Sequence, residues 1–187
     1  YGVHWDRTQT WWDMSSTYHR YVTRCSAMLR RGLFVADVLY LAAEGAPNVF
    51  LAPPSAFQPG EFKDRWGHNF DGCAPGTLIA RASVKNGEIV LPDGMRYRVL
   101  VLPQVETMTP ELLKKIAELA EAGATVVGMP PKASPSLSGH PDCDVQVRAI
   151  AESLFGVGTK EGTIRKVGAG SAVLDTSAYR WAQENPL

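Results

Sequence analysis

The sequence lacks a long apolar run and has no excess of charge of either sign. No stretch approaches the roughly 20 consecutive apolar residues that a membrane-spanning helix needs. Its 19 basic and 19 acidic residues give a formal charge of zero. No long-range field therefore favours nucleic acid or an anionic membrane surface, and neither is expected as a partner. Any partner must be recognised through local chemistry.

Close cysteine pairs are also missing. Cys25, Cys73 and Cys143 are odd in number and far apart, unlike the spacings of zinc sites or redox motifs. Three unrelated thiols are the favoured interpretation, with Cys25 on the core face of a helix. His140 lies close to Cys143 in the sequence GHPDC, a composition typical of a turn. No metal ligand set is predicted.

Nucleotide and nucleophile motifs are absent as well. The sequence has neither G-x-G-x-x-G after a predicted strand nor G-x-x-x-x-G-K-[ST]. The glycines at 168 and 170 favour a hairpin turn. A nucleophile elbow needs Ser or Cys on a sharp strand-to-helix turn, but residues 129–132 read Met-Pro-Pro-Lys. A hydrolase or amidase triad is therefore not expected there.

Residues 95–131 instead have the pattern of one strand, one helix and a second strand. The apolar runs at 98–102 and 124–128 suit strands that are covered on both faces. Thr109, Pro110 and Glu111 form a helix start, and Gly123 a helix stop. A unit of this length predicts parallel strands joined by a right-handed crossover.

The remaining segments extend this alternation. A helix is expected from Ser15 or Ser16, acting as its cap, to Gly32, with an apolar face that includes Cys25. A strand is predicted at 34–41 and a short helix at 77–82. Tight turns are predicted at 86–87 and 93–94, on either side of a strand at 88–91. The last predicted elements are a helix that is capped by Asp144 and ended by Gly156, and two strands at 163–167 and 171–174. The order predicts an α/β fold: a three-layer, doubly wound, mostly parallel sheet with helices on both faces.

The opening segment does not fit this alternation. Trp5, Asp6, Arg7, Trp11 and Trp12 stand within eight positions. Indoles stack on flat apolar faces of sugars while Asp and Arg bond hydroxyl groups, so the mixture suits a carbohydrate pocket. The alternative is that the tryptophans form an inter-domain contact and that Asp6 and Arg7 are a surface pair. Residues 62–71 have a similar aromatic and polar mixture.

At these residues the sequence resembles a known family. GVHWDRTQTWWDMSSTYHRYVTRCSAMLRRGLFVADVLYLAAE and NFDGCAPGTLIARASVKNGEIVLPDGMRYRVLVLP strongly resemble the middle of large bacterial α-L-rhamnosidases of glycoside hydrolase family 106. The resemblance covers about residues 2–155. It implies that the first segment is the end of a catalytic (β/α)8 barrel. It implies that the rest is a flavodoxin-like domain similar to class I glutamine amidotransferases.

The resemblance also implies hydrolysis of terminal α-L-rhamnose from plant or bacterial glycans, in a secreted or periplasmic setting. The family's acid and base are glutamates on barrel strands that would precede Tyr1, so no catalytic residue is assigned. Calcium is implied for the parent enzyme, and no cofactor for these residues. The positions that match family phrases, and are carried over as substrate-binding or pocket-supporting residues, are Trp5, Asp6, Arg7, Thr10, Trp11, Trp12, Asn69, Phe70 and Asp71.

Three domains are expected on this basis: residues 1–32 as the tail of a barrel with its connecting helix, 33–176 as the amidotransferase-like domain, and 177–187 as the start of a linker or further domain. The chain is then a non-catalytic fragment of a glycoside hydrolase that binds carbohydrate through its parent barrel. Two alternatives stay open, a standalone flavodoxin-like interaction or ligand-binding module and a true amidotransferase-type enzyme. An exposed tryptophan-rich segment would favour homo-oligomers or docking onto the sheet domain.

Overall fold

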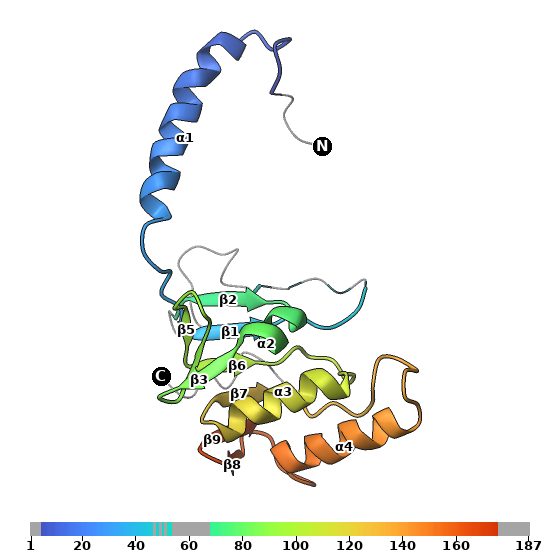
Figure 1. Ribbon diagram of the computed structural model, residues 1–187. Helices are drawn as coiled ribbons and strands as arrows, with labels where there is room; N and C mark the ends of the chain where they lie inside the picture. Colours follow the sequence, from blue (N-terminus) through green and yellow to red (C-terminus); the bar gives the residue numbers. More distant parts are fainter. Residues whose placement is uncertain (1–4, 47, 49, 51, 54–67, 176–187) are drawn as a thin grey trace. The chain divides into compact units, whose positions relative to one another are not determined.

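The computed structural model describes residues 5–46, 48, 50, 52–53 and 68–175, and it separates into two compact units (Figure 1). Unit 1 is Tyr1–Phe34 and unit 2 is Val35–Leu187. Each unit is described by itself below. The interpretation of residues 177–187 lies outside the described residues.

Unit 1 contains one long helix. A 3-10 turn, η1 (Trp12–Met14), leads directly into α1 (Ser15–Leu29). The helix was expected here, but its cap was predicted wrongly: Met14 is the N-cap residue, and no side chain caps the helix. The preceding turns already set the helical path, with Trp12 N bonded to Gln9 O at 3.1 Å and Met14 N to Trp11 O at 3.0 Å. A capping hydroxyl is therefore not needed to start the helix.

The apolar face of α1 is not covered within unit 1. The helix has no buried residue, and Tyr21, Met28 and Leu29 are 67%, 76% and 85% exposed. Cys25, expected in a core, is only half-buried. Among the described residues, no helix is long and apolar enough to cross a membrane.

Unit 2 is built on a six-stranded sheet, which confirms the mostly parallel α/β class. Its strands are β1 (Val38–Leu41), β2 (Phe70–Cys73), β6 (Val99–Val101), β7 (Thr125–Gly128), β8 (Ile164–Val167) and β9 (Gly170–Leu174). The spatial order is β2-β1-β6-β7-β9-β8. Every neighbouring pair is parallel except β8 with β9, which form the hairpin expected around the glycines at 168 and 170.

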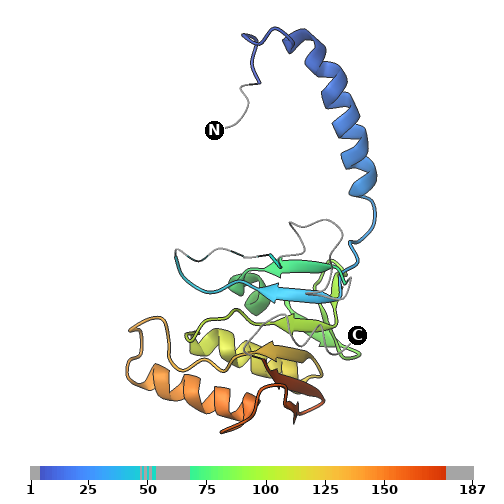
Figure 2. The same cartoon turned by 180° about the vertical axis from the view of Figure 1, so that it is seen from behind.

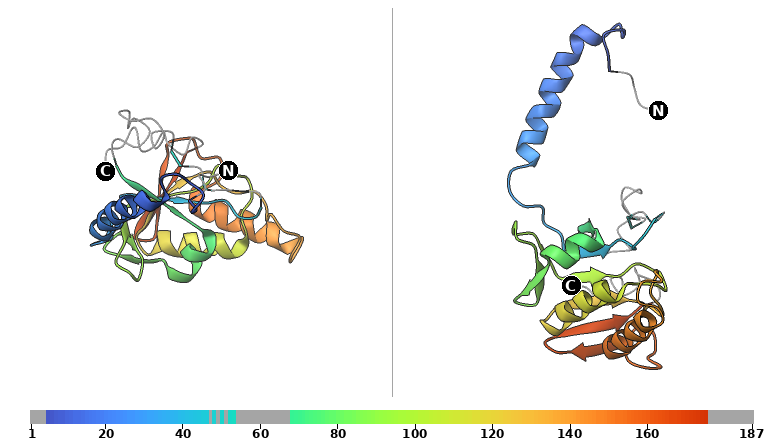
Figure 3. Two further views of the ribbon diagram at one scale, coloured as in Figure 1. Left: turned by 90° about the horizontal axis from the view of Figure 1, so that it is seen from above. Right: turned by 45° about the vertical axis from the view of Figure 1, so that its right-hand side comes forward.

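Three helices of unit 2 lie side by side on one face of this sheet (Figure 3). They are α2 (Pro75–Arg81), α3 (Pro110–Glu121) and α4 (Asp142–Phe155), with α3 in contact with both of the others. Seen from behind, β1 and β2 lie in front of α2 (Figure 2). Among the described residues of unit 2 these three helices share a single face, so the expectation of helices on the opposite face stays a prediction.

Both faces of the sheet are nevertheless buried, as a three-layer arrangement requires. The side chains on the helix-covered face are Leu39, Leu41, Leu100, Leu102, Val126 and Ala172. Those on the opposite face are Val38, Tyr40, Val99, Val101, Val127 and Val173. Residues of β1, β6, β7 and β9 alternate between the two sets, which explains why the strands read as continuous apolar runs.

The predicted strand-helix-strand unit is confirmed as β6, α3 and β7. The Thr109 hydroxyl accepts the Leu112 N–H at 3.3 Å, so Thr109 caps α3 as expected. Pro110 is the first helical residue, and Gly123 follows the helix with φ of 127°. Ala124 N then bonds Leu119 O at 2.9 Å, which turns the chain into β7.

A small antiparallel sheet projects between α2 and β6. It consists of β3 (Ser83–Lys85), β4 (Glu88–Val90) and β5 (Arg96–Tyr97). Asn86 and Gly87 join β3 to β4 with φ of 55° and 81°, as the tight-turn prediction required. Ile89 and Tyr97 are fully buried in the same core as the main sheet.

One polar contact ties this small sheet to the edge of the large one. The Tyr97 hydroxyl donates to the Asp71 carboxylate on β2 at 2.9 Å. Burial, and then this bond to a carboxylate, raise the pKa of Tyr97 far above its ordinary value. The neutral hydroxyl is therefore the form that the fold holds.

Two boundaries differ from those predicted. The strand expected at 34–41 is reduced to Val38–Leu41, since Phe34 belongs to unit 1 and Val35 is 76% exposed. Asp144 does not cap α4, which begins two residues earlier at Asp142. The Asp144 carboxylate instead accepts Ser134 N at 2.8 Å, so it fixes the loop before the helix.

Two glycine substitutions are expected to act in opposite directions. A Cβ at Gly170 would lie 2.3 Å from Ala124 O, whereas a Cβ at Gly76 in α2 meets nothing within 4 Å. Gly170→Ala should therefore destabilise the chain by about 1–3 kcal/mol through overpacking. Gly76→Ala should stabilise it by about 0.4–1 kcal/mol. Thermal unfolding measures both, and equal melting temperatures for the two variants would contradict the packing of β9 against the end of α3.

Tyr97→Phe is expected to have an effect that depends on pH. Near neutral pH the lost bond to Asp71 should cost about 1 kcal/mol. The folded-state pKa of Tyr97 lies above its unfolded value, so its contribution is complete below about pH 10 and is lost as the pH rises further. The stability gap between wild type and variant should therefore narrow in alkali. Urea unfolding at about pH 8 and about pH 10.5 measures it, and a gap that stays constant or widens would show that the folded-state pKa of Tyr97 is not raised.

Candidate functional site

The aromatic side chains of the opening segment gather around Trp5. The ring centroid of Trp5 lies 4.9 Å from that of Trp11 in an edge-to-face arrangement, 5.2 Å from Tyr18 and 5.0 Å from His19. Tyr18 and His19 lie on the first turns of α1, and the turn before the helix brings Trp11 back to Trp5. Two of the predicted tryptophans are thus brought together, along with two aromatic residues that the sequence interpretation did not select.

This cluster borders a hollow of about 310 Å³ lined by Trp5, Trp11, Met14, Ser15 and Tyr18. Its size is at the lower end of the range for small-molecule pockets. The lining carries no charged side chain and only two hydroxyl groups, so it offers flat apolar surface with few polar contacts. Trp5 is 42% exposed, so part of its side chain is accessible to a ligand.

Asp6 and Arg7 are exposed, and Asp6 is engaged within its own loop. The Asp6 carboxylate accepts the Thr8 N–H at 2.8 Å and also the Thr8 hydroxyl. The Thr8 hydroxyl, followed by its N–H, lowers the pKa of Asp6, so the carboxylate stays ionised. Trp12 is 38% exposed and is not among the residues lining the hollow.

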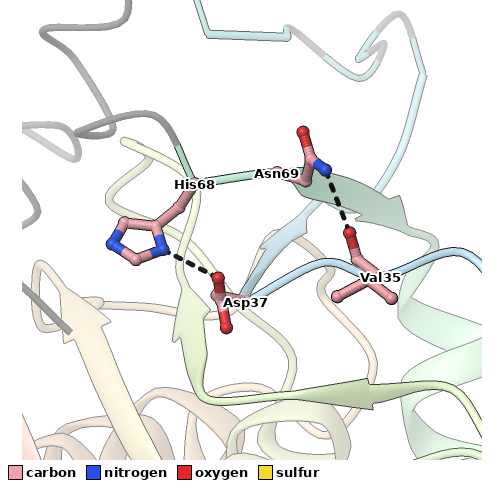
Figure 4. Close-up of polar contacts among 4 residues, drawn as sticks. All are labelled: Val35, Asp37, His68 and Asn69. Carbon is pink, nitrogen blue, oxygen red and sulfur yellow. Dashed lines mark hydrogen bonds and ion pairs between the residues drawn. The ribbon is translucent and has the colours of Figure 1, made fainter.

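Asn69 and Asp71 lie in unit 2, where they hold the edge strand β2. The Asn69 side-chain amide donates to Val35 O at 3.1 Å (Figure 4). The backbone carbonyl of Asn69 accepts the Asp37 N–H at 3.1 Å. Asp71 accepts the Tyr97 hydroxyl, as described above. The residues expected to face sugar therefore fall into two groups on separate units, and these contacts of Asn69 and Asp71 are internal to unit 2.

A histidine-carboxylate pair lies beside Asn69 and was not predicted. His68 Nδ1 is 2.7 Å from Asp37 Oδ2, and both side chains are partly exposed (Figure 4). The two residues are 31 positions apart in the chain, so no local sequence pattern could have revealed the pair. Asp37 precedes β1 and His68 precedes β2, and their contact joins the amino ends of two neighbouring strands.

The described residues do not supply a metal site. No group of three or more His, Cys, Asp or Glu side chains in the described ranges could hold an ion. Calcium favours several carboxylate and carbonyl oxygens at once, and Asp6 is committed to Thr8. All three cysteines are free thiols, and burial, followed by the nearby Asp71 charge, raises the pKa of Cys73.

Comparison with known proteins gives three findings. The family model for glycoside hydrolase family 106, described as alpha-L-rhamnosidase, matches residues 1–184. A curated protein of Formosa agariphila named "Putative beta-glucuronidase" is 37% identical over 158 residues, which are 84% of this chain and 13% of that protein. The solved structure of a rhamnosidase from Novosphingobium sp. PP1Y is 25% identical, with a TM-score of 0.72, over 98% of this chain and 17% of that one.

The chain thus spans less than a fifth of the length of the relatives it matches. The family match itself extends over nearly every residue, through both units and past the described part of unit 2. The resemblance seen in the tryptophan-rich segment and in the segment from Asn69 is therefore confirmed, and the chain belongs to glycoside hydrolase family 106.

Proposed function

We propose that this chain is part of an enzyme that removes terminal α-L-rhamnose from glycans, and that its unit 1 contributes an aromatic surface to the sugar site. The observation that carries the proposal is the hollow around Trp5, Trp11 and Tyr18. Family membership supplies the reaction class, hydrolysis of a glycosidic bond. The carboxyl pair that such hydrolysis needs is assigned to the parent barrel rather than to these residues.

The name of the Formosa agariphila relative suggests a second sugar, a glucuronide. The two sugars differ at the carbon attached to C5, which is a methyl group in rhamnose and a carboxylate in glucuronic acid. A carboxylate requires a cation or several N–H donors, and the lining of the hollow has no charged side chain. A methyl group is suited to the indole and thioether surfaces that are present. This chemistry favours the deoxy sugar.

The two units correspond to two roles. Residues 1–32 are proposed as the tail of a catalytic barrel, because the apolar face of α1 is uncovered within unit 1 and such a face needs a partner surface. Residues 33–176 are proposed as the amidotransferase-like domain, and the observed unit boundary after Phe34 supports that division. Residues 177–187 are proposed as the start of a linker or further domain.

Unit 2 is proposed to be a flavodoxin-like scaffold without catalytic function. Numbered along the chain, its five parallel strands stand in the order 2-1-3-4-5, which is the flavodoxin-like order. The chain that leaves β7 at Gly128 continues as Met129, Pro130 and Pro131 without entering a helix. That segment supports the absence of a nucleophile elbow, so an amidotransferase activity is not proposed.

The same proposal includes the location, metal and ligand that the family implies. The parent enzyme would be secreted or periplasmic in a bacterium, and calcium would be held by residues outside the described ranges. A carbohydrate is the proposed ligand, and nucleic acid is disfavoured by the formal charge of zero. The exposed side chains of α1 also support self-association when the chain is isolated.

Trp11→Ala in the full-length enzyme should weaken use of an aryl α-L-rhamnoside. Loss of an indole that stacks on the sugar should raise KM about tenfold, which corresponds to about 1.4 kcal/mol. Trp5→Ala should do the same. Trp12→Ala should have a smaller effect, because Trp12 does not line the hollow. Steady-state hydrolysis of the rhamnoside, and of the corresponding glucuronide, measures these effects.

Tyr21→Ala is the matched control. Tyr21 is an aromatic residue of the same helix, 67% exposed, and does not line the hollow. Because the exposed face of α1 is proposed to pack against the barrel, this substitution should lower the melting temperature of the enzyme and leave KM unchanged. Unaltered rhamnoside hydrolysis after both Trp5→Ala and Trp11→Ala would show that these indoles do not contact the sugar.

A further inference from the structure

Glu44 lies at the point of the unit 2 sheet where ligands bind in related architectures. β1 pairs with β2 on one side and with β6 on the other. The chain passes from β1 to β2 and then returns across β1 to form β6. In open parallel sheets, the crevice outside the carboxyl ends of the strands at such a reversal is the usual ligand site. Glu44 follows the carboxyl end of β1 by three residues.

The Glu44 carboxylate reaches from this position to the start of α3, which follows β6. Its Oε2 accepts the Thr109 N–H at 2.7 Å, and its Oε1 accepts the Thr109 hydroxyl at 2.7 Å. The same hydroxyl accepts the Leu112 N–H at 3.3 Å. A single threonine thus receives a bidentate carboxylate from one side and caps the helix on the other.

This arrangement is the one that a helix start offers to a bound anion. The first N–H groups of a helix have no intrahelical partner and lie at the positive end of its dipole, so they bind phosphate or carboxylate groups. Here the anion is a side chain of the same unit, separated from Thr109 by 65 positions in the chain. Its bonds are short, as expected for bonds to an ionised acceptor.

The neighbouring loops lie against each other at the same edge. Met108 N donates to Ala133 O at 3.0 Å, and Lys132 N donates to Glu106 O at 2.8 Å. The Lys132 ammonium also pairs with the Glu106 carboxylate. The loop after β6 is therefore bonded to the loop after β7, while Glu44 bonds the segment after β1 to α3.

We infer that Glu44 is an internal ligand: its carboxylate occupies the anion position at the strand-order reversal of unit 2 and joins the segment after β1 to the start of α3 as a structural clamp. The site that related folds use for a ligand then serves to join β1 to α3. This inference concerns unit 2 alone and does not depend on which sugar the proposed enzyme cleaves.

Glu111 provides an internal comparison for this role. It is an exposed carboxylate in the first turn of the same helix, so it experiences the same helix dipole. The contacts of Glu44 differ because they are two directed hydrogen bonds to Thr109. Substitution of each residue separates the effect of charge near the helix start from that of the clamp.

The first test is chemical rescue in the 187-residue chain. Glu44→Ala should lower the unfolding midpoint by on the order of 5 °C. Sodium acetate should restore at least half of that loss when compared with sodium chloride at equal ionic strength, because acetate can take the vacated position. Glu111→Ala should lower the midpoint by less than half as much and show no acetate-specific recovery. An unchanged midpoint in Glu44→Ala, or a loss that acetate does not restore, would overturn the inference.

Amide hydrogen exchange tests the same contact directly. The Thr109 amide should exchange slowly in wild type, at least tenfold faster in Glu44→Ala, and slowly again in that variant with acetate. Glu44→Gln, which retains one acceptor oxygen, covers the case in which Glu44→Ala fails to fold and should give an intermediate rate. Thr109→Ser keeps both donors and should match wild type. Equal Thr109 exchange in wild type and in the Glu44 variants would refute the clamp.

Discussion

A parallel sheet has to be covered on both faces, because its strands are joined by crossovers that pass over it. This requirement explains most of unit 2. Leu39, Leu100 and Val126 meet the helices on one face, while Val38, Val99 and Val127 are buried on the other. β6, α3 and β7 form the centre of this arrangement, since α3 contacts both α2 and α4. Both termini of α3 are therefore fixed by tertiary contacts. Thr109 donates to Glu44 at one end, and the turn at Gly123 packs against β9 at the other.

The helix of unit 1, in contrast, is not covered within its own unit. It has the amphipathic pattern of a core element, yet the face that contains Tyr18 and Tyr21 is exposed within the unit. A helix face with this many apolar side chains is normally covered by another surface. The same segment holds the aromatic hollow, whose lining residues are uncharged and mostly aromatic. The uncovered helix and the hollow are both accounted for by the proposal that unit 1 is part of a larger sugar-binding domain.

The parts of the fold that could be predicted are those fixed by neighbours in the sequence. The cap at Thr109, the turn at Asn86 and Gly87, and the strand-helix-strand order at 95–131 all depend on interactions within a few residues. The predictions that were wrong or missing concern features that depend on tertiary contacts. Asp144 has the appearance of a helix cap but accepts Ser134 N across the preceding loop. β1 begins at Val38 rather than at Phe34, because Phe34 belongs to unit 1. The pairing of Asp37 with His68 joins residues 31 positions apart.

The candidate site shows the same limit. Residue type alone identified the tryptophan-rich segment, because indoles beside charged groups are characteristic of sugar recognition. It could not distinguish Trp5 and Trp11, which line the hollow, from Trp12, which does not. Nor could it show that the Asp71 carboxylate accepts the Tyr97 hydroxyl of a strand 26 positions away. Glu44 is the opposite case: nothing in its local sequence attracts notice, and its importance comes from a partner 65 positions away. In this chain, the conspicuous residues of unit 1 carry the proposed recognition chemistry, whereas the inconspicuous Glu44 of unit 2 bonds the segment after β1 to the start of α3.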